Sequence, residues 1–117
     1  MKRETGKWVR KAEEDWQGAF VCFHCQQAAD KYLKALVQDL GVAVPKTHNL
    51  KDLLKLLIPH DASLAPLQRR SWSLTRYAVD FRYPDFRTST RQMRAAMRNA
   101  ERVRVELRKR LGLVSPP

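Results

Sequence analysis

Turn-forming residues gather in only four short stretches of this chain, at residues 41–48, 59–63, 80–90 and 114–117. Only four Gly and six Pro occur among 117 residues, which disfavours an all-β fold because such folds need frequent turns. The stretches between the turns are rich in Ala, Leu, Lys, Arg and Gln, and these residue types favour helices. A chain of this length builds a single core. We therefore predict an all-α fold, an up-and-down bundle of four to five helices.

Residues 4–40 carry the first helical pattern. Aromatic residues from Trp8 to Phe23 recur at multiples of three and four positions. An apolar arc with a spacing of about 100° per residue then continues to Leu40, and Gly41 stands where helices usually end. The pattern favours one continuous or kinked helix, and the alternative is a break near Gly18.

Three further helices are predicted. Residues 50–58 follow Asn49 as an N-cap, residues 64–79 follow Ser63 as an N-cap, and the last helix spans about 89–111. The apolar sides that the spacing predicts to be buried consist of Leu50, Leu53, Leu54, Leu57, Leu67, Leu74, Tyr77, Ala78, Met93, Ala96, Met97, Ala100, Val103, Leu107 and Leu111.

Positive charge is concentrated in the second half of the chain. The net charge is +11, and residues 61–117 hold 13 Lys and Arg against 5 Asp and Glu, whereas residues 1–60 hold 10 against 7. Such an excess attracts nucleic acid or an acidic protein. Four arginines on the last helix lie opposite its apolar side: Arg91, Arg94, Arg98 and Arg102. Two interpretations of this row remain, a solvated face or a surface that binds a polyanion through guanidinium groups.

Cys22 and Cys25 form a C-x-x-C pattern in the middle of a predicted helix. Redox pairs of this type sit at a helix N-terminus, and at this spacing the Cβ atoms stand about 5–6 Å apart, too far for an unstrained disulfide. No second pair of cysteines or histidines completes a four-ligand zinc site. We expect buried, reduced cysteines, no metal and no cofactor.

The compartment follows from two further observations. No apolar run approaches the roughly 18–20 residues of a membrane span, and the N-terminus does not resemble a signal peptide. Together with unpaired cysteines, this pattern predicts a cytoplasmic protein with no membrane partner.

Three groups of polar residues are candidates for a binding or catalytic site. His24, Gln27, Lys31 and Lys34 share one face of the first helix, which is either solvated or binds an anion or nucleotide. His48 stands just before a helix N-terminus, where an imidazole either caps the helix or serves as an acid or base.

The third group contains Arg76, Tyr77, Arg82 and Tyr83, around a turn that Pro84 forces out of the helix. An Arg beside a Tyr offers a phosphate contact and base stacking, and the alternative is a structural turn held by an arginine–aspartate pair.

Several segments together resemble the HEPN domain family, named for a nucleotide-binding domain of higher eukaryotes and prokaryotes. The segments are A-E-E-D at 12–15, C-F-H-C-Q-Q-A-A-D-K-Y-L-K-A-L at 22–36, P-K-T-H-N-L at 45–50, Tyr77, and R-Y-P-D at 82–85. The resemblance covers nearly the whole chain. It implies one HEPN-like helical domain at residues 1–113, which leaves residues 114–117 as a disordered tail.

The resemblance also implies a homodimer that binds a nucleotide or RNA, often paired with a minimal nucleotidyltransferase in a toxin–antitoxin-like module. Many family members are metal-independent ribonucleases with an Arg, four to six intervening residues and then a His. This chain departs from that motif, because no Arg stands five to seven residues before His24, His48 or His60. Only seven residues separate Asp15 from Phe23, so the family's first hairpin is expected to be merged, shortened or exchanged between subunits.

Three functional hypotheses result, the third being a purely structural helical dimer whose arginine row meets an acidic protein surface. The first is a binding protein that holds a nucleotide, RNA or a nucleotidyltransferase through the polar stripe, the turn and the arginine row. The second is a ribonuclease whose base and phosphate clamp are His48 and Arg82.

Overall fold

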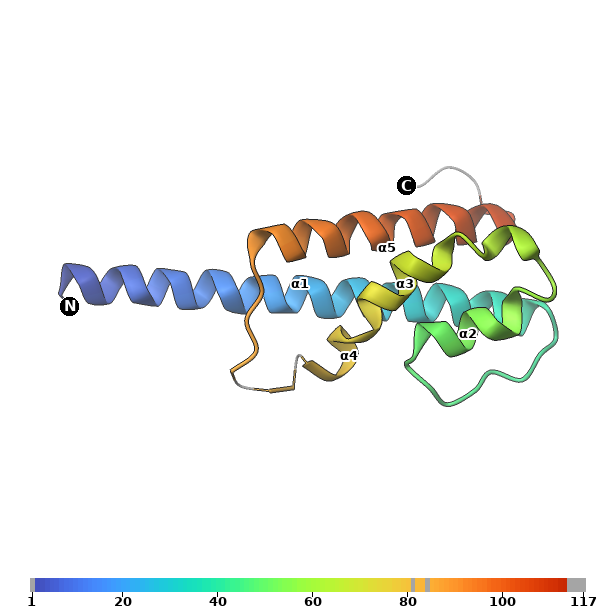
Figure 1. Ribbon diagram of the computed structural model, residues 1–117, viewed down its shortest axis with the longest axis horizontal. Coiled ribbons are helices and arrows are strands. Elements are labelled where there is room, and N and C mark those ends of the chain that lie inside the picture. Colours follow the sequence, from blue (N-terminus) through green and yellow to red (C-terminus); the bar gives the residue numbers. More distant parts are fainter. Residues whose placement is uncertain (1, 81, 84, 114–117) are drawn as a thin grey trace.

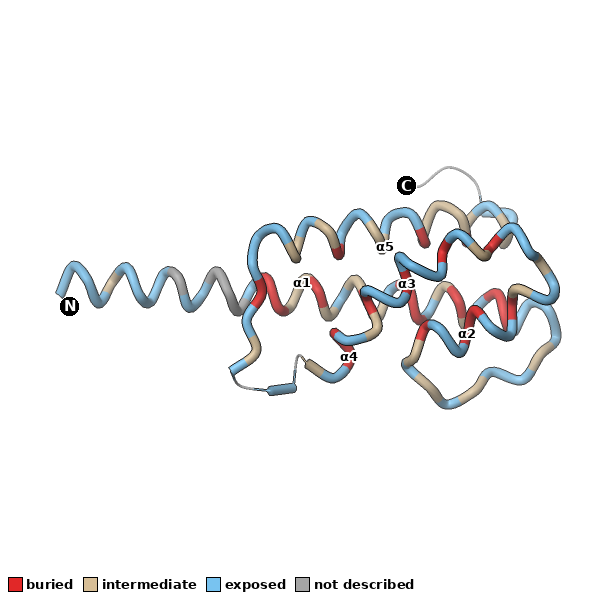
Figure 2. Tube along the Cα trace, viewed as in Figure 1, coloured by how far each residue is buried: buried red, intermediate tan, exposed pale blue. Residues whose placement is uncertain are grey.

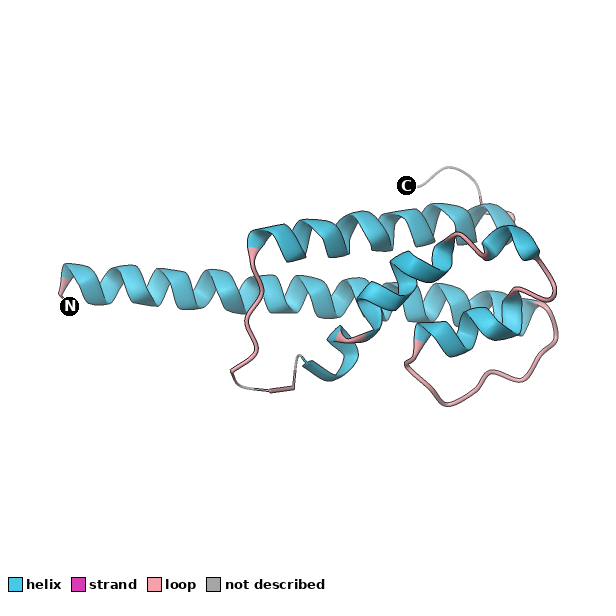
Figure 3. Ribbon diagram, in the orientation of Figure 1, coloured by secondary structure: helices cyan, strands magenta, loops and turns pink. Residues whose placement is uncertain are grey.

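The computed structural model describes residues 2–80, 82–83 and 85–113, and within the first helix it leaves out the side chains of residues 11 and 14–16. The expectations for the Trp16 side chain, for Pro84 and for a disordered tail at 114–117 lie outside this description. All regular structure in the described part is helical, so the predicted all-helical bundle is confirmed (Figure 1, Figure 3). The elements are α1 (Arg3–Asp39), α2 (Leu50–Leu57), the 3-10 helix η1 (Ala62–Leu64), α3 (Leu67–Thr75), α4 (Tyr77–Asp80) and α5 (Thr90–Arg110).

Helix α1 is continuous through Gly18, as the apolar spacing favoured. Gly18 is needed for close packing rather than for a break, because a Cβ there would stand 2.4 Å from Oγ1 of the buried Thr88. The helix ends as predicted at Gly41, which has a φ of 77° and donates its N–H to the carbonyl of Gln38. The N-terminal half of α1 projects beyond the other helices, and the molecule is 59 Å long (Figure 1).

Helix α5 lies beside the second half of α1 and runs in the same direction (Figure 1). Thr88, just before α5, approaches Gly18. Farther along, Arg104 and Arg108 of α5 bond to the hydroxyl of Tyr32. The bond from Arg108 is the main reason why the pKa of Tyr32 is lowered. Ser89 caps α5, because its Oγ accepts the N–H of Gln92 at 3.0 Å and the Gln92 side chain accepts the Ser89 N–H at 2.8 Å.

Helix α2 packs against α1 and α3, and α3 packs against both α5 and α1, which closes the bundle. Asn49 caps α2 as predicted, with its Oδ1 3.0 Å from the N–H of Lys51. The predicted cap at Ser63 is wrong, because Asp61 accepts the Ser63 N–H at 3.0 Å and caps η1 instead. Arg110 also donates to the Asp61 carboxylate at 2.9 Å, a tertiary contact that local sequence does not reveal. The predicted helix 64–79 is therefore divided into η1, α3 and α4.

The core lies where α1, α2, α3 and α5 face one another, and the N-terminal half of α1 stays largely exposed (Figure 2). Most of the apolar positions predicted to be buried are buried or packed against the core. Met97 is the exception at 51% exposure, because it lies at the edge of the apolar side of α5 rather than at its centre. The four arginines predicted on the opposite side of α5 are all exposed.

Candidate nucleic-acid interface

The arginine row on α5 comprises Arg91, Arg94, Arg98 and Arg102, and it lies along the outer side of the helix. Within the described residues, Arg102 is the member with a carboxylate partner, at 3.3 Å from Glu106. The two carboxylates of α5 also pair with cations outside the row: Glu101 pairs with Arg104, and Glu106 pairs with Lys109 and Arg110. The row is thus a run of cations that the described carboxylates neutralise only at one end.

A shallow hollow of about 530 Å³ lies beside this row. Arg70 of α3 lines it together with Arg98 and Arg102 of α5, and Glu101 is the acidic residue at its edge. Two helices therefore place three arginines around one concave surface, to which Met97 and Val105 add apolar atoms. Arginines suit a phosphate, because each guanidinium group offers a planar set of donors.

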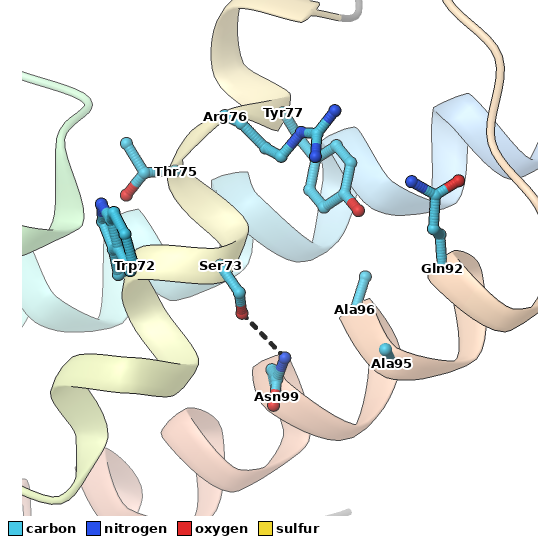
Figure 4. Close-up of a pocket in the computed structure, with 9 residues that line it drawn as sticks. All are labelled: Trp72, Ser73, Thr75, Arg76, Tyr77, Gln92, Ala95, Ala96 and Asn99. Carbon is cyan, nitrogen blue, oxygen red and sulfur yellow. Dashed lines mark hydrogen bonds between the residues drawn. The ribbon is translucent and has the colours of Figure 1, made fainter.

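A larger groove of about 590 Å³ separates α3 from α5 (Figure 4). Asn99 spans the groove from α5, donating to Ser73 Oγ at 2.9 Å and accepting from Arg70 Nη1 at 3.2 Å. Gln92 reaches the groove from the start of α5, and Arg76 and Tyr77 form its opposite wall (Figure 4). The groove therefore offers both charged and hydrogen-bonding groups.

The sequence singled out Arg76 and Tyr77 together, and the structure gives them different surroundings. The Arg76 side chain is 56% exposed, and its Nε lies 2.9 Å from the Asp80 carboxylate. Its guanidinium carbon is 5.6 Å from the centre of the Tyr77 ring. Tyr77 is 5% exposed and hydrogen-bonds to Cys22, and burial raises the pKa of its hydroxyl. Arg76 is thus accessible, whereas Tyr77 is mainly part of the core.

Arg82 and Tyr83 follow α4 in a turn, with their N–H groups bonded to the carbonyls of Val79 and Asp80. Both residues are exposed, and Tyr83 is 58% exposed. This exposure is compatible with ligand contact, but no described contact joins Arg82 to His48.

His48 instead contacts a buried carboxylate on α1. Its Nδ1 lies 3.0 Å from Oδ2 of Asp30, a residue that is only 2% exposed. A carboxylate only accepts hydrogen bonds, so Nδ1 carries a proton, and in the neutral imidazole Nε2 is then the nitrogen with the lone pair. The His48 side chain is 58% exposed. The arrangement orients an accessible imidazole, which is the geometry that a general base needs.

Two further members of the predicted polar stripe belong to this cluster. Lys34 Nζ lies 3.1 Å from both Asp30 oxygens and neutralises the buried carboxylate. Gln27 donates to the Gln26 side chain at 2.7 Å, and Gln26 in turn donates to the His48 carbonyl at 2.9 Å. Lys34 and Gln27 are therefore engaged in holding the loop before α2 against α1.

The other two members of the stripe lie on the outside of α1. His24 is exposed and stacks on Phe20 with 5.7 Å between the ring centres. Lys31 is also exposed. The predicted stripe is thus divided between an internal cluster and two surface residues.

The cysteines occupy the core-facing side of α1 and are free. Burial raises the pKa of Cys22, and burial followed by the nearby Cys22 raises the pKa of Cys25 to about 11. Both thiols are therefore protonated and unreactive near neutral pH. The described residues contain no group of three or more His, Cys, Asp or Glu side chains that could hold a metal ion.

Three residues of these surfaces did not emerge from the sequence analysis. Asp30 lies on the apolar side of α1, and only the fold shows that His48 and Lys34 meet it. Asn99 lies on α5 between the apolar side and the arginine row. Trp72 lies on α3 outside the side that was correctly predicted to be buried. That position was the signal by which the sequence could have indicated an exposed tryptophan.

Comparison with known proteins agrees with the class that these features define, a small helical bundle with a basic outer face. The protein-family model that matches is the HEPN domain, over residues 5–110. The chain belongs to the HEPN domain family. This membership supports a nucleotide- or RNA-related role in general. No match was found among curated proteins or among solved structures. No described helix is both long enough and apolar enough to span a membrane.

Proposed function

We propose that this HEPN protein binds RNA or a nucleotide through the basic face of α5, which consists of Arg91, Arg94, Arg98 and Arg102. The observation that carries the proposal is the hollow beside this face, which Arg70 of α3 lines together with Arg98 and Arg102 of α5. Polyphosphate ligands are held mainly by such cations, whose counterions are released on binding. Arg82 and Tyr83, which are exposed in the turn after α4, are proposed as a separate contact for the ligand.

The direct test is binding of a fluorescently labelled single-stranded RNA, measured by anisotropy in EDTA. The double variant Arg94→Ala/Arg98→Ala should bind at least tenfold more weakly than the wild type. The matched control is Arg3→Ala/Arg10→Ala, which removes the same charge from exposed positions at the projecting end of α1. Equal affinity of the wild type and the α5 variant would reject this face as the binding surface.

A second candidate function is metal-independent RNA cleavage, and the contact between His48 and Asp30 is the observation that favours it. In this proposal His48 Nε2 takes the proton of the 2′-hydroxyl, whose oxygen attacks the adjacent phosphorus while the bond from phosphorus to the 5′-oxygen breaks and the leaving oxygen takes a proton from water. Arg82, brought close by the bound RNA or by a second subunit, stabilises the charge on the phosphate. The test is cleavage of end-labelled RNA in EDTA by the wild type, His48→Ala and Arg82→Ala. Cleavage that persists in His48→Ala would exclude this site.

Partners are proposed on separate grounds. The projecting half of α1 exposes Trp8 to 75% and Val9 to 43%, an apolar surface that a second copy would cover in a homodimer. Light scattering at micromolar concentration should therefore give the mass of a dimer. We also propose that the protein pairs with a minimal nucleotidyltransferase in a toxin–antitoxin-like module, which co-purification of the two proteins tests. The free cysteines support a reducing compartment such as the cytoplasm.

A further inference from the structure

Trp72 lies on the outer side of α3 and is 68% exposed. The opposite side of the same helix is buried through Leu67, Ser71 and Leu74. Single exposed apolar residues are common on protein surfaces, so the exposure of this indole alone decides nothing. Its surroundings, however, set Trp72 apart from the other exposed apolar side chains.

Trp72 lies between two hollows of the surface. One is the groove of about 590 Å³ between α3 and α5, in which Ser73 and Asn99 offer hydrogen-bonding groups (Figure 4). The other is a hollow of about 330 Å³ toward α2, lined by Lys51, Gln68, Arg69 and Trp72. The indole therefore has open space beside it toward both neighbouring helices, enough for a planar ring to approach.

Cations flank Trp72 along the helix. Arg69 precedes it by three positions and Arg76 follows it by four, so the three residues share one edge of α3. The Arg76 guanidinium turns from this edge toward the Tyr77 ring (Figure 4). Arg69 is exposed, and the Arg76 side chain is 56% exposed. Lys51 adds a third positive charge from α2. Asp80 is the carboxylate described in contact with this group, through Arg76.

An aromatic side chain between cations matches the chemistry of single-stranded nucleic acid. Each unpaired nucleotide offers a flat apolar base and an adjacent phosphate, and proteins bind such strands with aromatic platforms in positively charged grooves. A duplex keeps its bases stacked inside the helix and does not offer them to a side chain. Charge favours this ligand over an apolar protein surface, because Lys51 and Arg69 line the hollow toward α2 together with Trp72.

We propose that Trp72 is a stacking platform for one unpaired base of single-stranded RNA, with Arg69 and Arg76 holding the phosphates on either side. The proposal rests on the proposed function, and it adds a site on α3 that distinguishes single-stranded from double-stranded RNA. Stacking tolerates any base, so the platform confers a preference for unpaired strands rather than for a sequence.

The test compares wild type, Trp72→Ala and Trp72→Phe in anisotropy measurements with a labelled single-stranded RNA and with the same sequence as a blunt duplex. Trp72→Ala should bind the single strand roughly 5- to 100-fold more weakly, and Trp72→Phe should keep most of the affinity. Duplex binding should not change in either variant. Leu56→Ala, which removes an exposed apolar side chain from α2, is the matched control and should bind both RNAs like the wild type.

The outcomes separate this proposal from the proposed function. If the wild type binds RNA and Trp72→Ala binds it with equal affinity, the stacking platform is overturned and the basic face of α5 stays in place. Wild type that binds no RNA would overturn the proposed function. Sedimentation of Trp72→Ala provides a further check. If the variant dissociates from a dimer and loses affinity equally for the single strand and the duplex, Trp72 belongs to a protein interface and the platform is overturned.

Discussion

Nδ1 of His48 lies 3.0 Å from Oδ2 of Asp30, and this contact joins the loop before α2 to the middle of α1. Gln26 holds the carbonyl of the same histidine, so one turn of α1 fixes both the backbone and the side chain of His48. The buried carboxylate is neutralised by Lys34 at 3.1 Å. The cluster therefore orients an accessible imidazole and at the same time stabilises the fold.

The contact between Asp30 and His48 should be measurable as a coupling in stability. We expect Asp30→Ala to lower the free energy of unfolding by about 1–3 kcal/mol, because it leaves Lys34 and His48 without their acceptor. His48→Ala should cost less, since it removes a half-exposed side chain. Urea unfolding of the two single variants and the double variant should show that the losses are not additive. Additive losses would mean that the two side chains do not interact in solution.

The close approach of Thr88 to Gly18 predicts a clash. Gly18→Ala should destabilise the protein by about 1–3 kcal/mol, because its Cβ would overlap the Thr88 hydroxyl. Adding Thr88→Ala should recover part of this loss. Gly6→Ala is the control, since a Cβ there meets nothing within 4 Å, and it should leave stability unchanged or raise it by up to about 1 kcal/mol. Thermal unfolding of the four proteins checks the prediction, which an unaffected Gly18→Ala protein would contradict.

Arg110 should make stability depend on pH in the acid range. Hydrogen bonds to Ser63 and then to Arg110 hold the pKa of Asp61 below its ordinary value, and the bond to Arg110 does the same for Glu106. A carboxyl whose pKa is lowered by folding stabilises the folded state above its ordinary pKa, and this contribution disappears as the pH falls through the lowered value. Arg110→Gln should therefore unfold at lower urea concentration than the wild type at pH 7, and the difference should narrow below about pH 4. A difference that is constant with pH would contradict this origin.

The Cys25 thiol should resist alkylation. Its pKa of about 11, against an ordinary value of 9.0, lowers the thiolate fraction at pH 8 by roughly two orders of magnitude. Mass spectrometry after iodoacetamide treatment should find the native protein largely unmodified and the urea-unfolded protein modified at both cysteines. Rapid labelling of native Cys25 would mean that the side chain is less protected than described.

Sequence reasoning recovered the parts of this molecule that local patterns determine. The apolar period identified α1 and α5 and their buried sides, and Asn49 marked the start of α2 because a cap acts over a few residues. The Ser63 cap was wrong because Asp61, two positions earlier, accepts the Ser63 N–H and caps η1 instead. Asp30 could not be paired with His48 from local patterns, since the two residues lie 18 positions apart in the chain and only the packing of the loop on α1 brings them together. The role proposed for Trp72 could not be predicted from the sequence, because it depends on the hollows that the fold creates on both sides of α3.

The measurement that most directly tests the central claim, RNA binding by the arginine row of α5, is the salt dependence of that binding. The logarithm of the binding constant should fall linearly with the logarithm of the salt concentration for the wild type. The slope for Arg94→Ala/Arg98→Ala should be less steep by about 1.4, because each lost phosphate contact on a single strand removes about 0.7. Arg3→Ala/Arg10→Ala should keep the wild-type slope. Identical slopes for all three proteins, or binding that does not respond to salt, would contradict the account.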